Sequence, residues 1–248
     1  MDLYQEEEIL SLEDATWKTR AITAFKEKMT NRAAPFPCIP ATQGYVLQHF
    51  RYGFLSDPRH PASSKELASL LKSFTQVSKT LGKYASLIVF YDTPSSLTNC
   101  TVEEMEQLFW QQLTDVSALD EKSWPSHIPE DAMNSAWEFC FHGEPYFMYC
   151  ATPLHVARKS RSFPFFTLAI TPRWVLEQFE ASPPIAQKIK AEIRQRLFAY
   201  DEIPPHPELK KYGEEDNYEW KQYFLRDDES ELVKCPFLRA QLNKQRGG

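Results

Sequence analysis

The chain has 248 residues, 42% of them hydrophobic and 25% charged, which predicts an ordinary globular protein with a buried core rather than a disordered chain. The net charge of −6 and the lack of a long basic stripe exclude a typical nucleic-acid-binding protein. No apolar run approaches the roughly 20 residues of a membrane-spanning helix, and the acidic first residues lack the layout of a signal peptide, so we expect a cytoplasmic protein without membrane contact.

The first third of the chain predicts two helices and one strand. Apolar residues at helical spacing predict a helix over 13–30. Prolines in 35–40 break regular structure, and the aromatic stretch 43–54 has no clear period. A second helix is expected over 63–81, and the apolar run 85–91 has the composition of a buried strand.

The rest of the chain continues with helices and a hairpin. Thr101 followed by Glu104 forms a capping box at the start of the third helix. His142, Gly143 and Glu144 are expected to turn a β-hairpin. The remaining predicted elements are a helix over 102–119, hairpin strands over 137–141 and 145–150, a strand over 165–171, and helices over 173–179 and 184–199.

Few, clustered strands with a hairpin connection favour an α+β fold, with a small antiparallel sheet packed with several helices in a single domain over 1–248. The sequence has no Gly-x-Gly-x-x-Gly or Walker loop and no Gly-x-Ser-x-Gly elbow, so neither nucleotide binding by those devices nor hydrolysis is supported. The aromatic content of 14% suits the wall of a flat apolar ligand, although core filling is the more frequent use. The same aromatic richness leaves a homodimer open.

The five cysteines are scattered and form no Cys-x-x-Cys pair. An odd number of isolated cysteines indicates reduced, buried thiols in a reducing compartment. Cys38 stands apart because it lies between Pro37 and Pro40 on a rigid stretch. A thiol there has three interpretations: a nucleophile, a thiolate ligand to iron, or a small buried hydrophobe, which the residues alone favour.

The segment 152–161 places His155 among three cations, Arg158, Lys159 and Arg161. A local positive field of this kind suits an anionic ligand such as a phosphate, a carboxylate or a cofactor propionate. A neutral histidine beside it can carry a proton or bind a metal. A surface loop with solvated charges is an equally good interpretation.

Two acids near the C-terminal end, Asp216 and Glu219, lie beside aromatic residues in the segment 216–223. Acids near an aromatic wall can hold a substrate amine or guanidinium group. From the residues alone, an exposed helix start is the favoured alternative.

Several short motifs together resemble the YqcI/YcgG family over about residues 20–230. They are Pro35-Phe36-Pro37-Cys38, Trp137-Glu138-Phe139, Gly143-Glu144-Pro145, the segment from Pro153 to Arg161, Thr171-Pro172-Arg173, His206-Pro207, and the segment from Glu219 to Phe224. Some members of that family are haem-dependent N-oxygenases, which hydroxylate a guanidine or amine nitrogen of a basic amino acid or its derivative, and some carry an amine on to a nitro group.

The resemblance therefore implies a b-type haem, dioxygen, an electron donor and a small cationic substrate, arginine-like or lysine-like. The haem would be bound non-covalently, because the sequence lacks a Cys-x-x-Cys-His motif. The open alternatives are a haem-binding sensor or carrier without turnover, and a haem-free binding or interaction protein.

Within this resemblance, residue chemistry assigns His155 as the axial ligand of the haem iron, with Cys38 as the rival ligand. Arg158, Arg161 and Arg173 are expected to pair with the haem propionates. Each of these roles is a prediction from residue chemistry and motif position.

The substrate end is assigned in the same way. Asp216 and Glu219 are expected to hold the cationic substrate. The apolar walls that haem burial requires are expected from Phe36, Phe50, Trp137 and Phe139.

Overall fold

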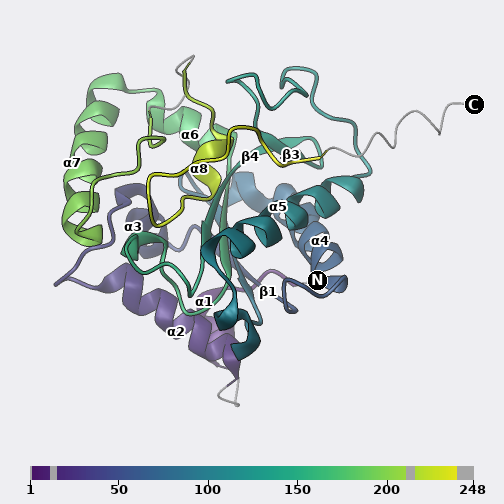
Figure 1. Ribbon diagram of the computed structural model, residues 1–248, viewed down its shortest axis with the longest axis horizontal. Helices are drawn as coiled ribbons and strands as arrows, with labels where there is room; N and C mark the ends of the chain where they lie inside the picture. Colours follow the sequence, from purple (N-terminus) through teal and green to yellow (C-terminus); the bar gives the residue numbers. More distant parts are fainter. Residues whose placement is uncertain (1, 12–15, 211–215, 239–248) are drawn as a thin grey trace, which may run out of the picture.

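Five strands form one sheet in the middle of the protein, which a computed structural model describes for residues 2–11, 16–210 and 216–238 (Figure 1). The strands lie in the order β1-β2-β5-β4-β3, with β1 and β2 parallel and the other neighbouring pairs antiparallel. Their bounds are β1 (Phe50–Leu55), β2 (Ser86–Tyr91), β3 (Phe139–Phe141), β4 (Glu144–Ala151) and β5 (Thr167–Pro172).

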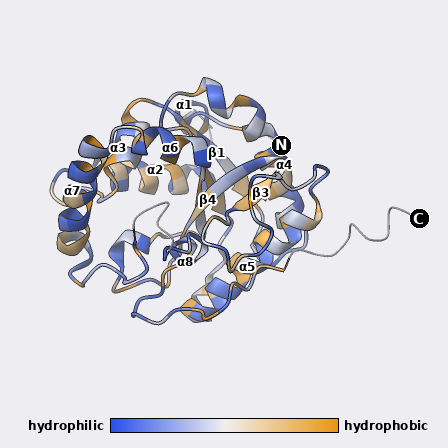
Figure 2. Ribbon diagram, turned by 90° about the horizontal axis from the view of Figure 1, so that it is seen from above, coloured by the Kyte–Doolittle hydropathy of each residue, from blue (hydrophilic) through white to orange (hydrophobic). Residues whose placement is uncertain are grey.

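Helices cover both faces of the sheet. Figure 2 shows α4 and α5 on one side of the strands and α2, α3, α6 and α7 on the other. None of the helices in the described residues is both long and apolar enough to cross a membrane. The helices are α1 (Glu6–Leu10), α2 (Trp17–Thr30), α3 (Ile39–Val46), α4 (Ala62–Val77), α5 (Val102–Ala118), α6 (Arg173–Glu180), α7 (Pro183–Asp201) and α8 (Trp220–Tyr223).

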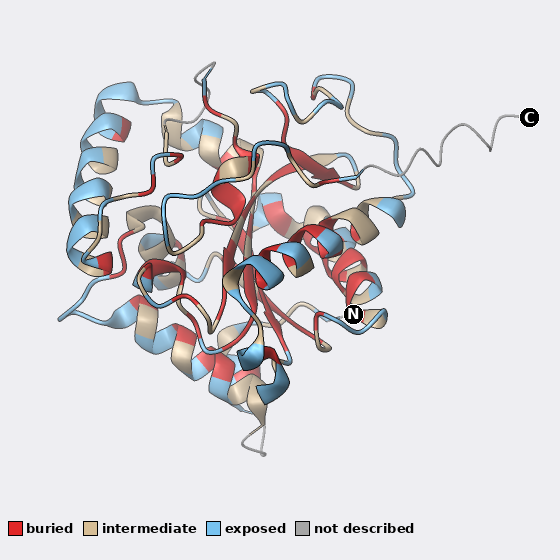
Figure 3. Cartoon of the chain, in the orientation of Figure 1, coloured by how far each residue is buried: buried red, intermediate tan, exposed pale blue. Residues whose placement is uncertain are grey.

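Strand β2 joins the two halves of the core because alternate side chains point to opposite faces. Leu87, Val89 and Tyr91 belong to the cluster shared with α4 and α5. Ile88 and Phe90 belong to the cluster shared with α2. Burying each such side chain contributes roughly 1.5–3 kcal/mol, which explains why the strands form the most deeply buried part of the protein (Figure 3).

The α+β class is confirmed, but the sheet is mixed where an antiparallel sheet was expected. The difference comes from β1, which the sequence analysis left unassigned within 43–54. Helix α4 carries the chain from the end of β1 back to the start of β2, and this crossover makes the two strands parallel.

Local signals account for the elements that were predicted well. Thr101 Oγ1 accepts a hydrogen bond from the Glu104 N–H at 3.2 Å, and the Glu104 carboxylate accepts one from the Thr101 N–H at 2.7 Å, so the capping box is confirmed. The β3–β4 turn places His142 and Gly143 at φ of 54° and 80°. Two positive φ values match a two-residue type I′ hairpin turn.

Two differences in the helices follow from local chemistry. Helix α2 begins at Trp17 rather than 13, and residues 13–15 lie outside the described part of the chain. Helix α3 begins at Ile39, inside the 35–40 stretch whose prolines were expected to break regular structure. Pro40 occupies its first turn, where a helix needs no backbone N–H from that residue.

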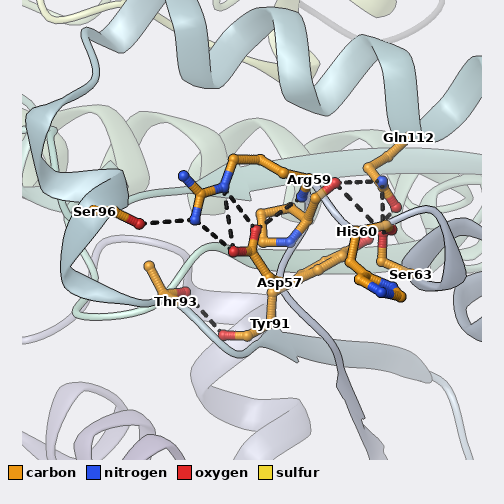
Figure 4. A network of polar contacts seen from close by, with 9 residues as sticks. Asp57, Arg59, His60, Ser63, Tyr91, Thr93, Ser96 and Gln112 are labelled. Carbon is orange, nitrogen blue, oxygen red and sulfur yellow. Dashed lines mark hydrogen bonds and ion pairs between the residues drawn. The ribbon is translucent and has the colours of Figure 1, made fainter.

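A polar network fixes the segments that follow β1 and β2 (Figure 4). Arg59 donates to the Asp57 carboxylate and, at 2.9 Å, to Ser96 Oγ. The buried Tyr91 hydroxyl donates to the side-chain oxygen of Gln112 on α5 at 3.3 Å. These groups pair with one another, so we assign the network a structural role.

Candidate functional site

A cavity of about 430 Å³ lies between the sheet and the helices α2, α3, α6 and α7. This volume falls in the range of about 300–1,000 Å³ that small-molecule and cofactor sites occupy. Its walls are mainly apolar, and the aromatic residues among them include Phe36, Phe50, Phe147, Tyr149, Phe163 and Phe179.

The cavity exists because this face of the sheet carries small side chains. Thr167, Ala169 and Thr171 alternate along β5 and therefore share one face. Ser86 on β2 and Ala151 on β4 extend the same floor. The Ser86 and Thr171 hydroxyls pair with each other at 2.9 Å, so most of the floor offers an apolar surface.

Helix α7 forms an outer wall of the cavity. Of its 19 residues, the two that are buried are Ala186 and Asp201, and Figure 3 shows most of the helix exposed. The face it turns inward has residues spaced three or four apart, as one side of a helix requires. That face consists of Lys190, Ile193, Arg194 and Leu197.

Lys28 brings a half-buried cation to the cavity wall. Its Nζ donates to the carbonyl oxygens of Lys159 and Ser162 at 3.0 and 2.7 Å. Burial lowers the pKa of Lys28 to about 8, and the charge of Asp201 opposes part of that change. The other charged residues along the cavity are Glu180, Lys190, Arg194, Lys210 and Glu219.

Cys38 also lines the cavity, as the N-cap residue of α3. Burial raises the pKa of its thiol, while the backbone N–H of Ala41 in the first turn of the helix opposes that shift. The thiol is therefore neutral in these apolar surroundings. A bound metal cation reverses this preference, because a coordinating thiol loses its proton.

His155 lies outside the cavity lining, and both of its ring nitrogens have partners. Nε2 lies 2.8 Å from the Leu225 carbonyl, which only accepts, so Nε2 carries the proton and Nδ1 accepts from Thr152 Oγ1 at 2.9 Å. Burial lowers the pKa of His155 to about 4. Its role as an iron ligand stays a prediction, and binding a metal here would first break one of these two hydrogen bonds.

Arg158 and Arg161 are buried, and they donate to backbone carbonyls rather than to carboxylates. The Arg158 guanidinium donates to Arg226, Pro204 and Asp228 at 2.6, 3.2 and 3.0 Å. These contacts tie the 152–161 segment to the C-terminal part of the described chain.

Arg161 makes the same kind of contact closer to the cavity. It donates to the carbonyls of Cys150, Tyr223 and Gln222 at 3.2, 3.0 and 2.8 Å. Its guanidinium carbon also lies 4.1 Å from the ring centre of Tyr149, a wall residue. The predicted pairing of both arginines with propionates stays a prediction, and the present contacts of Arg161 hold α8 against the sheet.

The other predicted residues separate in space. Arg173 pairs with Glu138 and Glu177 at 3.4 and 3.0 Å and is not part of the lining. Asp216 is largely exposed and lies 3.4 Å from the Lys210 ammonium. Glu219 is 4% exposed and lines the cavity.

The sequence analysis missed several lining residues, although signals for some existed. Lys28 lies three residues after Phe25 and one before Met29, and a lysine within an apolar helix face is such a signal. Of the expected walls, Phe36 and Phe50 line the cavity. Trp137 and Phe139 instead belong to the core cluster shared with α4 and α5.

Comparison with known proteins confirms the family resemblance. The sequence profile of the YqcI/YcgG family matches residues 25–238. The chain is 45% identical over 241 residues to "Uncharacterized protein YqcI" of Bacillus subtilis (strain 168), covering 96% of this chain and 95% of the relative. It is 47% identical over 233 residues to "Uncharacterized protein YcgG" of the same strain, covering 93% and 92%.

A more distant relative carries a functional name. The chain is 28% identical over 229 residues to "Putative N(omega)-hydroxy-L-arginine synthase DcsA" of Streptomyces lavendulae, covering 89% of this chain and 84% of the relative. No solved structure matches the chain.

Proposed function

The chain belongs to the YqcI/YcgG family, and we propose that it is a haem-dependent N-oxygenase acting on a guanidine or amine nitrogen of a basic amino acid or derivative. The observation that carries the proposal is one apolar cavity lined by both a cysteine thiol, Cys38, and a buried carboxylate, Glu219. The name of the arginine-hydroxylating relative supports the same reaction class.

The residues along the cavity fit a haem. A haem would need one strong protein ligand for its iron, such as a thiolate, and would supply the chemistry of dioxygen activation. Cys38 would supply that ligand from the cavity wall, whereas both ring nitrogens of His155 already have hydrogen-bond partners. We therefore propose Cys38 as the iron ligand, and a separate donor would supply the electrons.

The propionates of a haem need cationic partners, and the cavity offers several. Lys28, Arg194 and Lys210 all belong to its lining. Charge-assisted hydrogen bonds from such groups to carboxylates are roughly twice as strong as neutral ones. We propose these three as the propionate-holding residues because they belong to the lining, whereas Arg158 and Arg161 do not.

The chain's own residues would bind and orient the substrate. Glu219 would offer a carboxylate to the cationic end, among mainly apolar walls that screen the attraction less than bulk water does. Fixing one end in this way holds a single nitrogen close to the reacting centre, which is the main contribution a binding site makes to such a step.

A haem titration of the purified protein, followed by a product assay with arginine-like and lysine-like substrates, tests this proposal. We expect a sharp Soret band that saturates at one haem per chain, and an N-hydroxylated product in the presence of dioxygen and a reductant. A Soret band without any product contradicts the oxygenase activity and favours a sensor or carrier. A protein that takes up no haem contradicts the whole proposal.

A further inference from the structure

Three polar side chains in and just before α8 are linked by hydrogen bonds beside the cavity. Asn217 is 1% exposed and donates through Nδ2 to the Glu219 carboxylate. Gln222 is 7% exposed and donates through Nε2 to Asn217 Oδ1 at 2.8 Å. Glu219 and Gln222 both line the cavity, whereas Asn217 is not part of the lining.

The chemistry of these three side chains determines which group donates and which accepts in each of the two hydrogen bonds. An ionised carboxylate only accepts, so Asn217 must turn its NH₂ toward Glu219. The Asn217 oxygen then faces Gln222 and must receive an N–H from it. The acceptor that Gln222 keeps is its side-chain oxygen, Oε1, and among the described residues no group donates to it.

The backbone beneath these side chains is also held. Arg161 donates to the carbonyls of Gln222 and Tyr223 at 2.8 and 3.0 Å. The Gln222 N–H donates to the Glu219 carbonyl at 2.9 Å. The backbone that carries the Glu219 and Gln222 side chains is therefore held in place. The hydrogen bond to Asn217 then determines which way the oxygen of the Gln222 amide points.

We propose that Gln222, turned by Asn217, offers its Oε1 as a second acceptor beside the Glu219 carboxylate, and that this pair selects a guanidinium over a primary ammonium group. Asn217 is the positioning residue and Gln222 the specificity-determining one. The inference rests on the proposed function for the location of the substrate, and it adds the residues that discriminate between its two substrate classes.

Two physical differences between the cations produce the selection. A guanidinium is planar and presents its N–H groups in a rigid fork, so two fixed acceptors can each take one without a further ordering cost. An ammonium is more strongly hydrated than a guanidinium, so it loses more hydration free energy when it enters an apolar cavity. A second fixed acceptor therefore favours the guanidinium.

Binding of L-arginine and L-lysine, measured by calorimetry on the full-length protein, tests the inference. These two ligands share the same amino-acid end and differ in the cationic end. We expect Gln222→Met to weaken arginine binding about tenfold and lysine binding less than about threefold, in line with one lost hydrogen bond to a charged group. Gln111→Met, on the exposed side of α5, is the matched control and should change neither affinity.

The role of Asn217 is tested by a double-mutant cycle. Asn217→Leu should lower the arginine-to-lysine affinity ratio in the wild-type background and leave it unchanged in the Gln222→Met background. Thermal unfolding of each variant identifies any that is misfolded. If Asn217→Leu lowers the arginine-to-lysine affinity ratio by the same factor in both backgrounds, Asn217 does not act through Gln222 and the positioning role is overturned.

The outcomes also separate the inference from the proposed function. An affinity ratio that Gln222→Met leaves unchanged, in a protein that binds haem and turns over, overturns the inference alone. Selective arginine binding that depends on Gln222, in a protein that takes up no haem, supports the inference and contradicts the oxygenase. A wild-type protein that binds neither cation overturns the inference.

Discussion

The two side chains singled out as iron ligands have opposite surroundings in the folded protein. Cys38 lines the cavity, and its thiol has a backbone N–H beside it. His155 lies between a hydroxyl and a carbonyl, away from the lining. Arg158 and Arg161, whose charges pointed to a ligand site beside His155, donate to backbone carbonyls. At the scale of single residues, then, burial and hydrogen-bond partners favour Cys38 over His155 as the candidate ligand.

The buried imidazole makes stability depend on pH. Because burial lowers the pKa of His155 to about 4, the unfolded chain takes up a proton between about pH 6.5 and pH 4 that the folded chain does not. The free energy of unfolding should therefore decrease as pH falls through this window, by at most about 3 kcal/mol, and the histidine should add no slope above it. Urea denaturation at a series of pH values measures this dependence.

The matched variants for that series are His155→Gln and His127→Gln. The first removes the titrating group from the core and should flatten the slope between about pH 6.5 and pH 4. The second changes an exposed histidine and should keep the wild-type slope. An unchanged slope in His155→Gln would show that other groups govern the acid sensitivity.

Some residues that line the cavity could be predicted from the sequence, and others could not. Glu219 was predicted from its aromatic neighbours and does line the cavity. Gln222 was missed, because a lone amide carries no pattern and its meaning depends on Asn217, which is paired with it in space. Arg158 and Arg161 stood out for their charge, yet they donate to carbonyls that sequence reasoning has no means to locate.

At the scale of elements, the 152–161 segment and the 220–228 segment hold each other in place. The Asp227 carboxylate accepts from three successive backbone N–H groups, those of Val156, Ala157 and Arg158, at 2.7, 3.1 and 3.0 Å. Arg161 adds its donors to the end of α8. This mutual anchoring positions the cavity wall that carries Glu219.

Removing the Arg161 guanidinium should reveal how much this anchoring contributes. Arg161→Met leaves three buried carbonyl oxygens without their donor, at roughly 1–3 kcal/mol for each group that stays unsatisfied. We expect the free energy of unfolding to fall by about 3 kcal/mol in chemical denaturation. Arg20→Met, at an exposed position on α2, is the control and should stay within about 0.5 kcal/mol of wild type. Equal stability of the two variants would contradict the anchoring role.

Periodicity predicted the long elements and failed at the short ones. Helices α4 to α7 follow the apolar spacing closely, and α5 also begins with the predicted capping box. Strand β1 was missed because five of its six residues are buried, which removes the alternation that marks a half-exposed strand. Helix α3 was missed because its prolines resemble a break in sequence while suiting a first turn in structure.

At the scale of the whole molecule, the cavity depends on how the sheet is assembled. Its floor combines small residues from β2, β4 and β5, and the order of these strands differs from their order in the chain. The small residues of the floor can be read from the sequence, but the strand order that makes them neighbours cannot. The sheet order brings Thr167, Ala169 and Ser86 onto one surface and leaves space above it.

Filling that space with a larger side chain should prevent the proposed haem from binding without unfolding the protein. Ala169→Phe places a large ring on the floor of the cavity, so we expect a haem titration to show no saturable Soret band. In the wild-type protein, haem at 100 times its dissociation constant should stabilise the fold by about 2.7 kcal/mol. Thermal unfolding with and without haem measures this effect, which the variant should lack.

Ala199→Phe, on the exposed surface of α7, is the control and should keep both the band and the haem-dependent stabilisation. Normal haem uptake by Ala169→Phe would show that haem binds elsewhere on the protein.

The spectrum of the reduced protein with carbon monoxide tests the central claim most directly, measured in the wild type, Cys38→Ala and His155→Gln. We predict the strongly red-shifted Soret band of a thiolate-ligated haem in the wild type, its loss in Cys38→Ala, and its retention in His155→Gln. A wild-type band at the position of an imidazole-ligated haem, lost only in His155→Gln, would contradict the assignment of the iron to the Cys38 side of the cavity.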